Sequence, residues 1–276
     1  MKPIPNPLPN ANKPRHPPGD VGRKSCRPTV CRPNYTRCIW YSISKMTILF
    51  GIHPDRYVEW FIPFIKEIER TLNPNGSFIL NINDKIVNKV RHPYVFDLIS
   101  EIHKQTNLKM FERCFWDKRK CLSHSKRFGD RVEFLFWFIK SEKFYIDMNA
   151  MRKPYNPISI KRMEKLLKRR YNRTEQNQDA AEYKAWSPNP LGALPSVLIE
   201  ISSESKRVSN THTAVFPEKL CEYFIKGASK KNDLICDIFS GSGTTCTVAK
   251  KLGRNYLGFD SSAIYNKEAE LRILNY

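Results

Sequence analysis

The stretch that decides the fold is Asp237-Ile-Phe-Ser-Gly-Ser-Gly-Thr-Thr245, in the last fifth of the chain. An apolar run, Leu234–Cys236, comes directly before it, and residues 247–252 follow with the pattern of a helix. A strand, a glycine-rich bend and a helix amino terminus form a place where backbone N–H groups can approach a polar cofactor. The sequence therefore predicts a cofactor loop within an α/β fold.

A second strand-like run, Tyr256–Phe259, is followed by an acid, Asp260, 23 positions after Asp237. In dinucleotide-binding folds, an acid at the end of this strand accepts hydrogen bonds from a ribose. The loop itself matches neither G-x-G-x-x-G nor G-x-x-x-x-G-K-[ST]. The pattern therefore favours neither a nicotinamide cofactor nor a phosphate cradle.

The chain is strongly basic, with 47 Lys and Arg against 27 Asp and Glu and a net charge of +20 over 276 residues. Its length suits one substantial α/β domain with a small extra subdomain. The charge favours a polyanionic partner such as nucleic acid, although a basic composition alone does not identify one. The sequence has no apolar run long enough for a membrane span and no signal-peptide core at its start, so we expect no membrane contact.

The eight cysteines include no C-x-x-C pair, which predicts reduced thiols and a cytoplasmic protein. Cys114, Cys121 and His124 are candidate zinc ligands by residue type alone. Their spacing matches neither a zinc ribbon nor a zinc finger, so the sequence predicts no metal.

Composition divides the chain at about residue 50. Residues 1–50 hold nine of the 19 prolines, three cysteines and a single acid, Asp20. We expect an irregular Pro/Cys-rich arm there, with no useful strand or helix before about Thr36. Residues 51–276 form the expected globular domain. Within it, we expect a catalytic half (51–148), a basic target-recognition segment (149–195) and a cofactor half (196–276).

Hydrophobic spacing predicts the elements of this domain. Apolar residues at three- and four-residue intervals predict a helix from Asp55 to Leu72, which Pro63 should kink or shift. Further helices are expected over residues 94–106 and 218–225, and strands over residues 77–82, 109–116 and 133–139. The stretch from Arg152 to Arg173 holds nine Lys and Arg and one acid. We expect a helix there whose positive face contacts phosphates, the alternative being a solvated surface.

The loop at residues 237–245 resembles the S-adenosylmethionine loop of the amino-group DNA methyltransferases. His212-Thr-Ala-Val-Phe-Pro-Glu-Lys-Leu220 is similar to the H-x-A-x-F-P-x-x-L segment that precedes this loop in the family, although alone it could be a staple between a helix and a sheet. The catalytic half comes first and the cofactor loop last, as in the beta group. The resemblance covers about residues 52–275.

Finer features resemble particular branches of the family. Residues 127–140 and 144–147 are more similar to the N4-cytosine enzymes than to the N6-adenine enzymes. Residues 192–195 and 202–207 are most similar to the methylases that modify CTAG.

The resemblance implies a permuted Rossmann-like, S-adenosylmethionine-dependent methyltransferase fold with a small basic target-recognition insertion. It also implies transfer of a methyl group to N4 of cytosine in duplex DNA, which protects that DNA from a cognate restriction endonuclease. The alternatives are N6-adenine methylation, an inactive DNA-binding remnant, and methylation of structured RNA. The implied cofactor-binding residues are Asp237, Phe239, Gly241, Ser242, Gly243, Thr244 and Asp260, with Phe216 and Pro217 covering the cofactor.

One family feature is missing. The family uses a Ser/Asp/Asn-Pro-Pro-aromatic tetrad upstream of the helix at Tyr57, and the sequence contains no such tetrad. The nearest matches, His16-Pro-Pro-Gly19 and Arg32-Pro-Asn-Tyr35, lack the acceptor or the second proline. The catalytic residues therefore stay unassigned. Because no cysteine follows a proline, the sequence also argues against a C5-cytosine enzyme.

Overall fold

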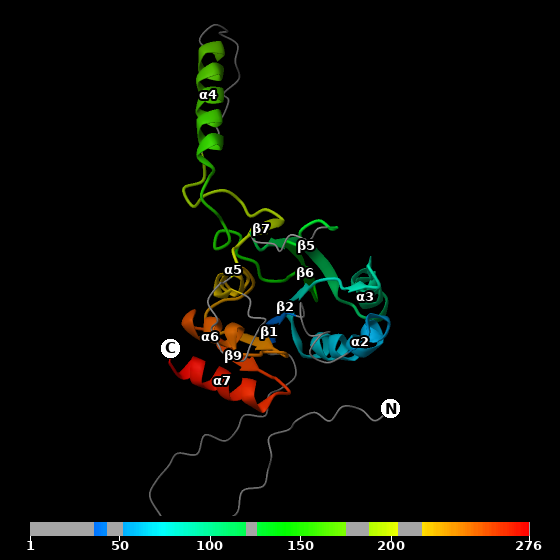
Figure 1. The fold of residues 1–276 in the computed structure, drawn as a ribbon. Helices are drawn as coiled ribbons and strands as arrows, with labels where there is room; N and C mark the ends of the chain where they lie inside the picture. The colour runs from blue at the N-terminus through cyan, green and yellow to red at the C-terminus, as the bar shows by residue number, and fades with distance from the viewer. Residues whose placement is uncertain (1–35, 43–51, 120–125, 175–187, 204–216, 276) are drawn as a thin grey trace, which may run out of the picture. The chain divides into compact units, whose positions relative to one another are not determined.

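The computed structural model describes residues 36–42, 52–119, 126–174, 188–203 and 217–275 (Figure 1). The elements follow in the order β1 Thr36–Ser42, α2 Pro54–Thr71, β2 Leu72–Ile82, β3 Ile86–Val87, β4 Val90–Arg91, α3 Tyr94–Gln105, β5 Lys109–Asp117, β6 Val132–Ile139, α4 Pro157–Thr174, β7 Leu198–Glu200, α5 Glu218–Ala228, β8 Leu234–Asp237, α6 Thr244–Lys251, β9 Asn255–Gly258 and α7 Ala263–Leu274.

Seven of the described strands form one sheet in the order β7-β5-β6-β2-β1-β8-β9. Strands β2, β1, β8 and β9 run parallel, whereas β6 is antiparallel to both of its neighbours, β2 and β5. The carboxyl ends of β8, β1, β2 and β5 therefore lie at one edge of the sheet, together with the amino end of β6. We call this the carboxyl edge.

β1 corrects the predicted domain boundary at residue 51. It lies in the middle of the sheet, where Ile39 pairs with Phe78 of β2 on one side and Cys236 of β8 on the other. The run Cys38-Ile-Trp-Tyr41 has the β-branched and aromatic character of a strand. The sequence left room for an element from about Thr36, but the proline-rich composition of residues 1–50 placed that stretch in the arm instead of the domain. The rest of the predicted arm lies outside the described residues.

The predicted helices and strands of the domain are confirmed, with small shifts at their ends. α2 runs unbroken through Pro63 and begins after His53, whose ring Nδ1 accepts a hydrogen bond from the Asp55 N–H. β2 starts at Leu72, earlier than the strand predicted from residue 77. In the described part of the chain, no helix is both long and apolar enough to cross a membrane.

The core has one layer on each face of the sheet, because side chains along β2 and β6 alternate between the two faces. Phe78 and Leu80 of β2 pack with α2 and α3 in one layer. Ile79 of β2 and Trp137 of β6 pack with α5 and α6 in the other. The sheet is therefore covered by a hydrophobic layer on each face.

Candidate functional site

The predicted cofactor loop lies at the carboxyl edge, where β8 ends at Asp237. Asp237 pairs with Gly258 of β9 on one side and with Trp40 of β1 on the other. One strand further, Ser42 at the end of β1 pairs with Asn81 of β2. The loop therefore shares its edge with the ends of the two central strands.

Hydrogen bonds join the cofactor loop to the turn after β9. The Ser240 N–H donates to the Phe259 carbonyl at 2.8 Å, and the Phe259 N–H donates to the Asp237 carbonyl at 2.9 Å. The Gly241 N–H donates to Asp260 Oδ2 at 3.0 Å, and the Ser262 N–H donates to Asp260 Oδ1 at 2.9 Å. Asp260 thus fixes the loop, and its carboxylate oxygens still have lone pairs for ligand hydroxyls.

Asp237 is a buried carboxyl in this loop, with 1% of its surface exposed. Thr245 Oγ1 donates to its Oδ2 at 2.6 Å, and the Phe239 N–H donates to its Oδ1 at 3.1 Å. Burial raises the pKa of Asp237 to about 6, although both hydrogen bonds favour the ionised form. Because none of the described ion pairs includes Asp237, a cationic ligand group would be a favourable partner for its carboxylate.

The two loop glycines adopt left-handed backbone conformations, with φ of 51° at Gly241 and 75° at Gly243. A Cβ on Gly243 would lie 2.7 Å from the Cβ of Ala269 in α7. Glycine at 243 is therefore required by the packing of α6 against α7 as well as by the loop conformation.

The remaining predicted cofactor residues have different surroundings. The Phe239 ring packs against Phe64 and Trp60 of α2, with ring centroids 5.5 and 6.2 Å away. Ser242 is buried. The Thr244 hydroxyl accepts a hydrogen bond from Arg272 Nη1 at 2.9 Å, which ties it to α7. These contacts pack the half-buried Phe239 ring against the core layer that includes α2, and they give Thr244 a structural partner.

The covering residues are only partly described. Pro217 is buried and precedes the first residue of α5 in extended conformation, with φ of −69°. Phe216 lies outside the described residues. Its prediction as an apolar wall over the cofactor therefore stays a prediction.

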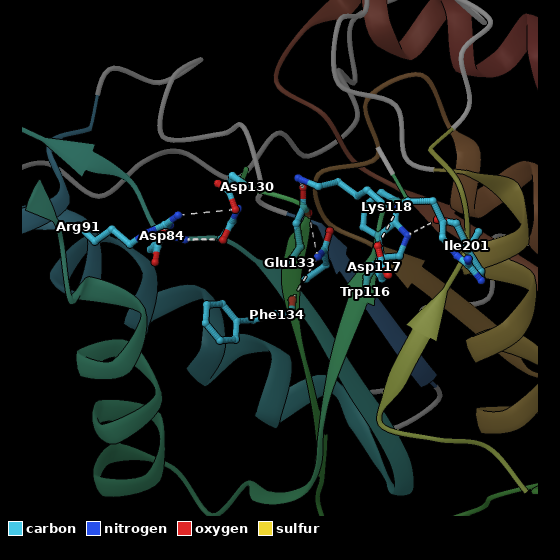
Figure 2. A network of polar contacts seen from close by, with 12 residues as sticks. Asp84, Arg91, Trp116, Asp117, Lys118, Asp130, Glu133, Phe134 and Ile201 are labelled. Atoms are coloured by element: carbon cyan, nitrogen blue, oxygen red, sulfur yellow. Dashed lines mark hydrogen bonds and ion pairs between the residues drawn. The ribbon is translucent and has the colours of Figure 1, made fainter. Parts of the chain in front are cut away.

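The carboxyl edge also carries a polar network that sequence reasoning missed (Figure 2). Asn81 Nδ2 donates to Glu133 Oε2, and Lys118 Nζ donates to Glu133 Oε1, both at 3.2 Å. Beside them, Arg131 Nε donates to Asp117 Oδ1 at 2.5 Å, and this contact lowers the pKa of Asp117 to about 2. Charged residues at the ends of the predicted apolar strands 109–116 and 133–139 were the available signal for this network.

The direction of β1 shows where in the sequence a catalytic tetrad next to this strand would have to lie to reach the carboxyl edge. The chain leaves β1 at this edge after Ser42, and residues 43–51 contain no proline. The near-matches at residues 16–19 and 32–35 come before β1 and lie outside the described residues. Because the chain enters β1 from the opposite edge, a tetrad directly before β1 would be at the wrong end of the strand.

Among the described residues, no three or more His, Cys, Asp or Glu side chains are grouped so that they could hold a metal ion. Cys114 is buried, and burial raises the pKa of its thiol to about 11. Cys121 and His124 lie outside the described residues.

Comparisons with known proteins agree on one family. A family model for DNA methylases, N6_N4_Mtase, matches residues 51–271. The Type II methyltransferase M.PvuII of Proteus hauseri is 28% identical over 253 residues, which cover 82% of this chain and 73% of that protein. M1.MboII of Moraxella bovis is 34% identical over 168 residues, or 58% of this chain and 60% of that protein.

Solved structures show the same fold. PvuII DNA methyltransferase (cytosine-N4-specific) superimposes with a TM-score of 0.65 at 22% identity, covering 87% of this chain and 80% of that one. The M1.HpyAVI–SAM complex superimposes with a TM-score of 0.55 at 20% identity, covering 88% and 90% of the two chains. The chain therefore has the Rossmann-like fold of these methyltransferases.

Proposed function

The chain belongs to the DNA methylase family whose model spans residues 51–271, and from this premise we propose that it transfers a methyl group from S-adenosylmethionine to N4 of cytosine in duplex DNA. The proposal rests on the cofactor loop at the carboxyl edge, which hydrogen bonds join to the turn after β9. Asp237 is buried at the base of this loop, and Asp260 accepts a hydrogen bond from its backbone. A cognate restriction endonuclease would be a functional partner, because methylation would protect DNA from it.

The residues of the loop fit this cofactor. The buried Asp237 carboxylate suits the positive charge of the methionine end, because a nearby cation would offset the cost of its burial. Asp260 can accept hydrogen bonds from the ribose hydroxyls with its remaining lone pairs. The Phe239 ring offers an apolar surface beside the loop.

When bound, S-adenosylmethionine supplies the methyl group on a sulfonium, an electrophile that an amino nitrogen can attack directly. The chain contributes alignment and hydrogen-bond acceptors at the place where charge develops. By the register of β1, an acceptor for the target amino group would lie just after Ser42. That acceptor remains unassigned, because the tetrad is absent from the sequence.

Cytosine N4 is proposed over adenine N6 on two grounds. One is the similarity to M.PvuII together with the name of the matching structure, a cytosine-N4-specific enzyme. The other is the resemblance of residues 127–140 and 144–147 to that branch. Because residues 192–195 and 202–207 resemble the methylases that modify CTAG, CTAG is the first target sequence to test.

The basic segment 149–195, which includes α4, is proposed to contact DNA phosphates.

A second candidate is an inactive DNA-binding remnant of such an enzyme. It is favoured by one specific observation: residues 43–51, which follow β1 in the sequence, contain no Pro-Pro-aromatic sequence. In this case the cofactor loop and the basic surface persist, whereas the acceptor for the amino group is missing.

Mass spectrometry of nucleosides separates these candidates. Unmethylated duplex DNA that includes CTAG sites, incubated with the full chain and S-adenosylmethionine, should yield 4-methylcytosine. 6-Methyladenine would support the adenine enzyme instead. Binding of both cofactor and DNA without product would support the remnant, and a preference for structured RNA in competition would contradict a DNA substrate. A no-cofactor reaction is the control.

A further inference from the structure

A surface at the carboxyl edge carries a fully exposed aromatic ring among cations. Phe128 is 99% exposed, and Val90, which follows Lys89 in the β3–β4 hairpin, is 68% exposed. We define the hairpin–loop surface as the β3–β4 hairpin with its entry, residues 85–91, and the loop segment 126–130. A ring this exposed buries almost none of its surface against the rest of the chain.

Both parts of this surface emerge from the edge that holds the cofactor loop. β2 ends at Ile82 and leads through Asn83 and Asp84 into the hairpin. The loop segment 126–130 belongs to the connection from the end of β5 to the start of β6. The hairpin–loop surface therefore shares the carboxyl edge with Asp237.

Polar contacts hold the loop segment against the hairpin on both sides of Phe128. Before it, Arg127 Nη2 donates to the carbonyl of Lys89 at the tip of the hairpin. After it, Asp130 Oδ2 accepts from Asn83 Nδ2 at 3.4 Å, and Asp130 Oδ1 lies 3.8 Å from Arg91 Nη2. Figure 2 shows Arg91 reaching towards Asp84 and Asp130. The side chains of residues 127 and 130, on either side of Phe128, thus contact the hairpin and its entry.

The charges around the ring are mainly positive. The hairpin–loop surface includes Lys85, Lys89, Lys126 and Arg127. Its nearby acids, Asp84 and Asp130, both face the Arg91 guanidinium. An aromatic ring flanked by cations matches single-stranded or unstacked nucleic acid, whose bases offer flat π-faces and whose phosphates offer negative charge.

We propose that Phe128 stacks on a base that has left the DNA stack at or beside the target, while the flanking cations contact the phosphates. This inference rests on the proposed function, because it takes DNA as the substrate. Extruding a base costs unstacking energy, and stacking on a fixed aromatic ring offsets part of it. Phe128 is therefore a positioning residue for DNA.

The test is equilibrium binding to two short fluorescein-labelled duplexes, one fully paired and one with a single unpaired cytosine. The full-length wild-type chain should bind the duplex with the unpaired base more tightly. Phe128→Ala should weaken that binding roughly 5- to 150-fold. It should leave the dependence of log K on log salt unchanged, because no phosphate contact is lost. Phe128→Tyr should retain the preference.

Matched variants separate stacking from charge and from folding. Phe96→Ala removes another exposed phenylalanine, on α3, and should leave DNA binding unchanged. Lys126→Ala should weaken binding to both duplexes alike and reduce the salt slope by about one. Equal binding by Phe128→Ala and wild type would overturn the inference. The inference would also be overturned if Phe128→Ala bound DNA like wild type but lost a binding to anionic phospholipid vesicles that the wild-type chain showed. The surface would then serve a membrane.

The outcomes for this inference and for the proposed function differ. If the wild-type chain methylates DNA and Phe128→Ala binds like wild type, only the inference fails. If the wild-type chain binds neither duplex, the inference and the DNA substrate of the proposed function fail together.

Discussion

Replacing Asp237 with asparagine should weaken binding of S-adenosylmethionine by roughly 10- to 100-fold and make the unliganded protein more stable at neutral pH. The loss of affinity follows from the loss of a carboxylate that would pair with the cofactor's positive charge. The gain in stability follows because burial penalises that carboxylate when no cation is present. Asparagine keeps the shape and can still pair with the Thr245 hydroxyl.

The sign of the pH dependence follows from the raised pKa. Asp237 changes from an ordinary pKa of 3.8 to about 6 in the folded chain. Above about pH 6, ionisation of this group therefore costs the folded state about 3 kcal/mol, and below its ordinary pKa the cost vanishes. The contribution of Asp237 to the free energy of unfolding should fall as pH rises between these values. Asp237→Asn should lack this fall.

Denaturant unfolding of the unliganded protein from about pH 4 to about pH 8, combined with cofactor titration, measures both effects. Asp97→Asn, which changes an exposed carboxyl on α3, is the control and should leave cofactor affinity unchanged. A variant at 237 that binds the cofactor like wild type would show that this carboxyl is not part of the site. An unchanged pH dependence would show that its burial carries no such cost.

Gly243→Ala should lower the free energy of unfolding by about 2–4 kcal/mol, whereas Gly253→Ala should lower it by only about 1 kcal/mol. Both glycines have left-handed backbones, with φ of 75° and 71°. A Cβ at 243 would meet Ala269 Cβ at 2.7 Å, whereas a Cβ at 253 would find its nearest neighbour, Lys231 Cγ, at 4.0 Å. The difference between the variants therefore isolates the packing of α6 against α7.

Urea unfolding of both variants measures this difference. Adding Ala269→Gly to Gly243→Ala should recover part of the loss, because it removes the nearest atom that the new Cβ would meet, although Ala269 Cα would still lie 3.1 Å away. The recovery should be incomplete, since glycine inside α7 costs about 1 kcal/mol. Equal losses at 243 and 253 would mean that α6 and α7 do not pack closely there.

Local sequence was sufficient for the elements that build the cofactor loop. The apolar run before Asp237 and the glycine-rich bend follow rules that act over a few residues, and the predicted Rossmann-like methyltransferase fold is confirmed. The pairing of Asp260 with the loop backbone was not predicted, because it depends on how two adjacent turns meet. The requirement for glycine at position 243 was likewise not predicted, because it depends on packing against Ala269, 26 positions away.

The sequence did not predict which strands and side chains meet at the carboxyl edge outside the cofactor loop. β1 was not counted in the domain because composition over residues 1–50 outweighed a seven-residue strand. The network of Asn81, Glu133 and Lys118 joins three separate strands or strand ends. The exposure of Phe128 depends on where the hairpin and loop lie. Such features follow from strand order, which hydrophobic periodicity does not specify.

The most direct test of the account is calorimetric titration of the full-length chain with S-adenosylmethionine. We expect saturable binding of one cofactor per chain, and loss of most of that affinity in Asp260→Ala, whose carboxylate joins the Gly241 and Ser262 backbone. Gly253→Ala, outside the loop, should bind like wild type. Failure of the wild-type chain to bind, or unchanged binding by Asp260→Ala, would contradict the placement of the methyl donor at this loop.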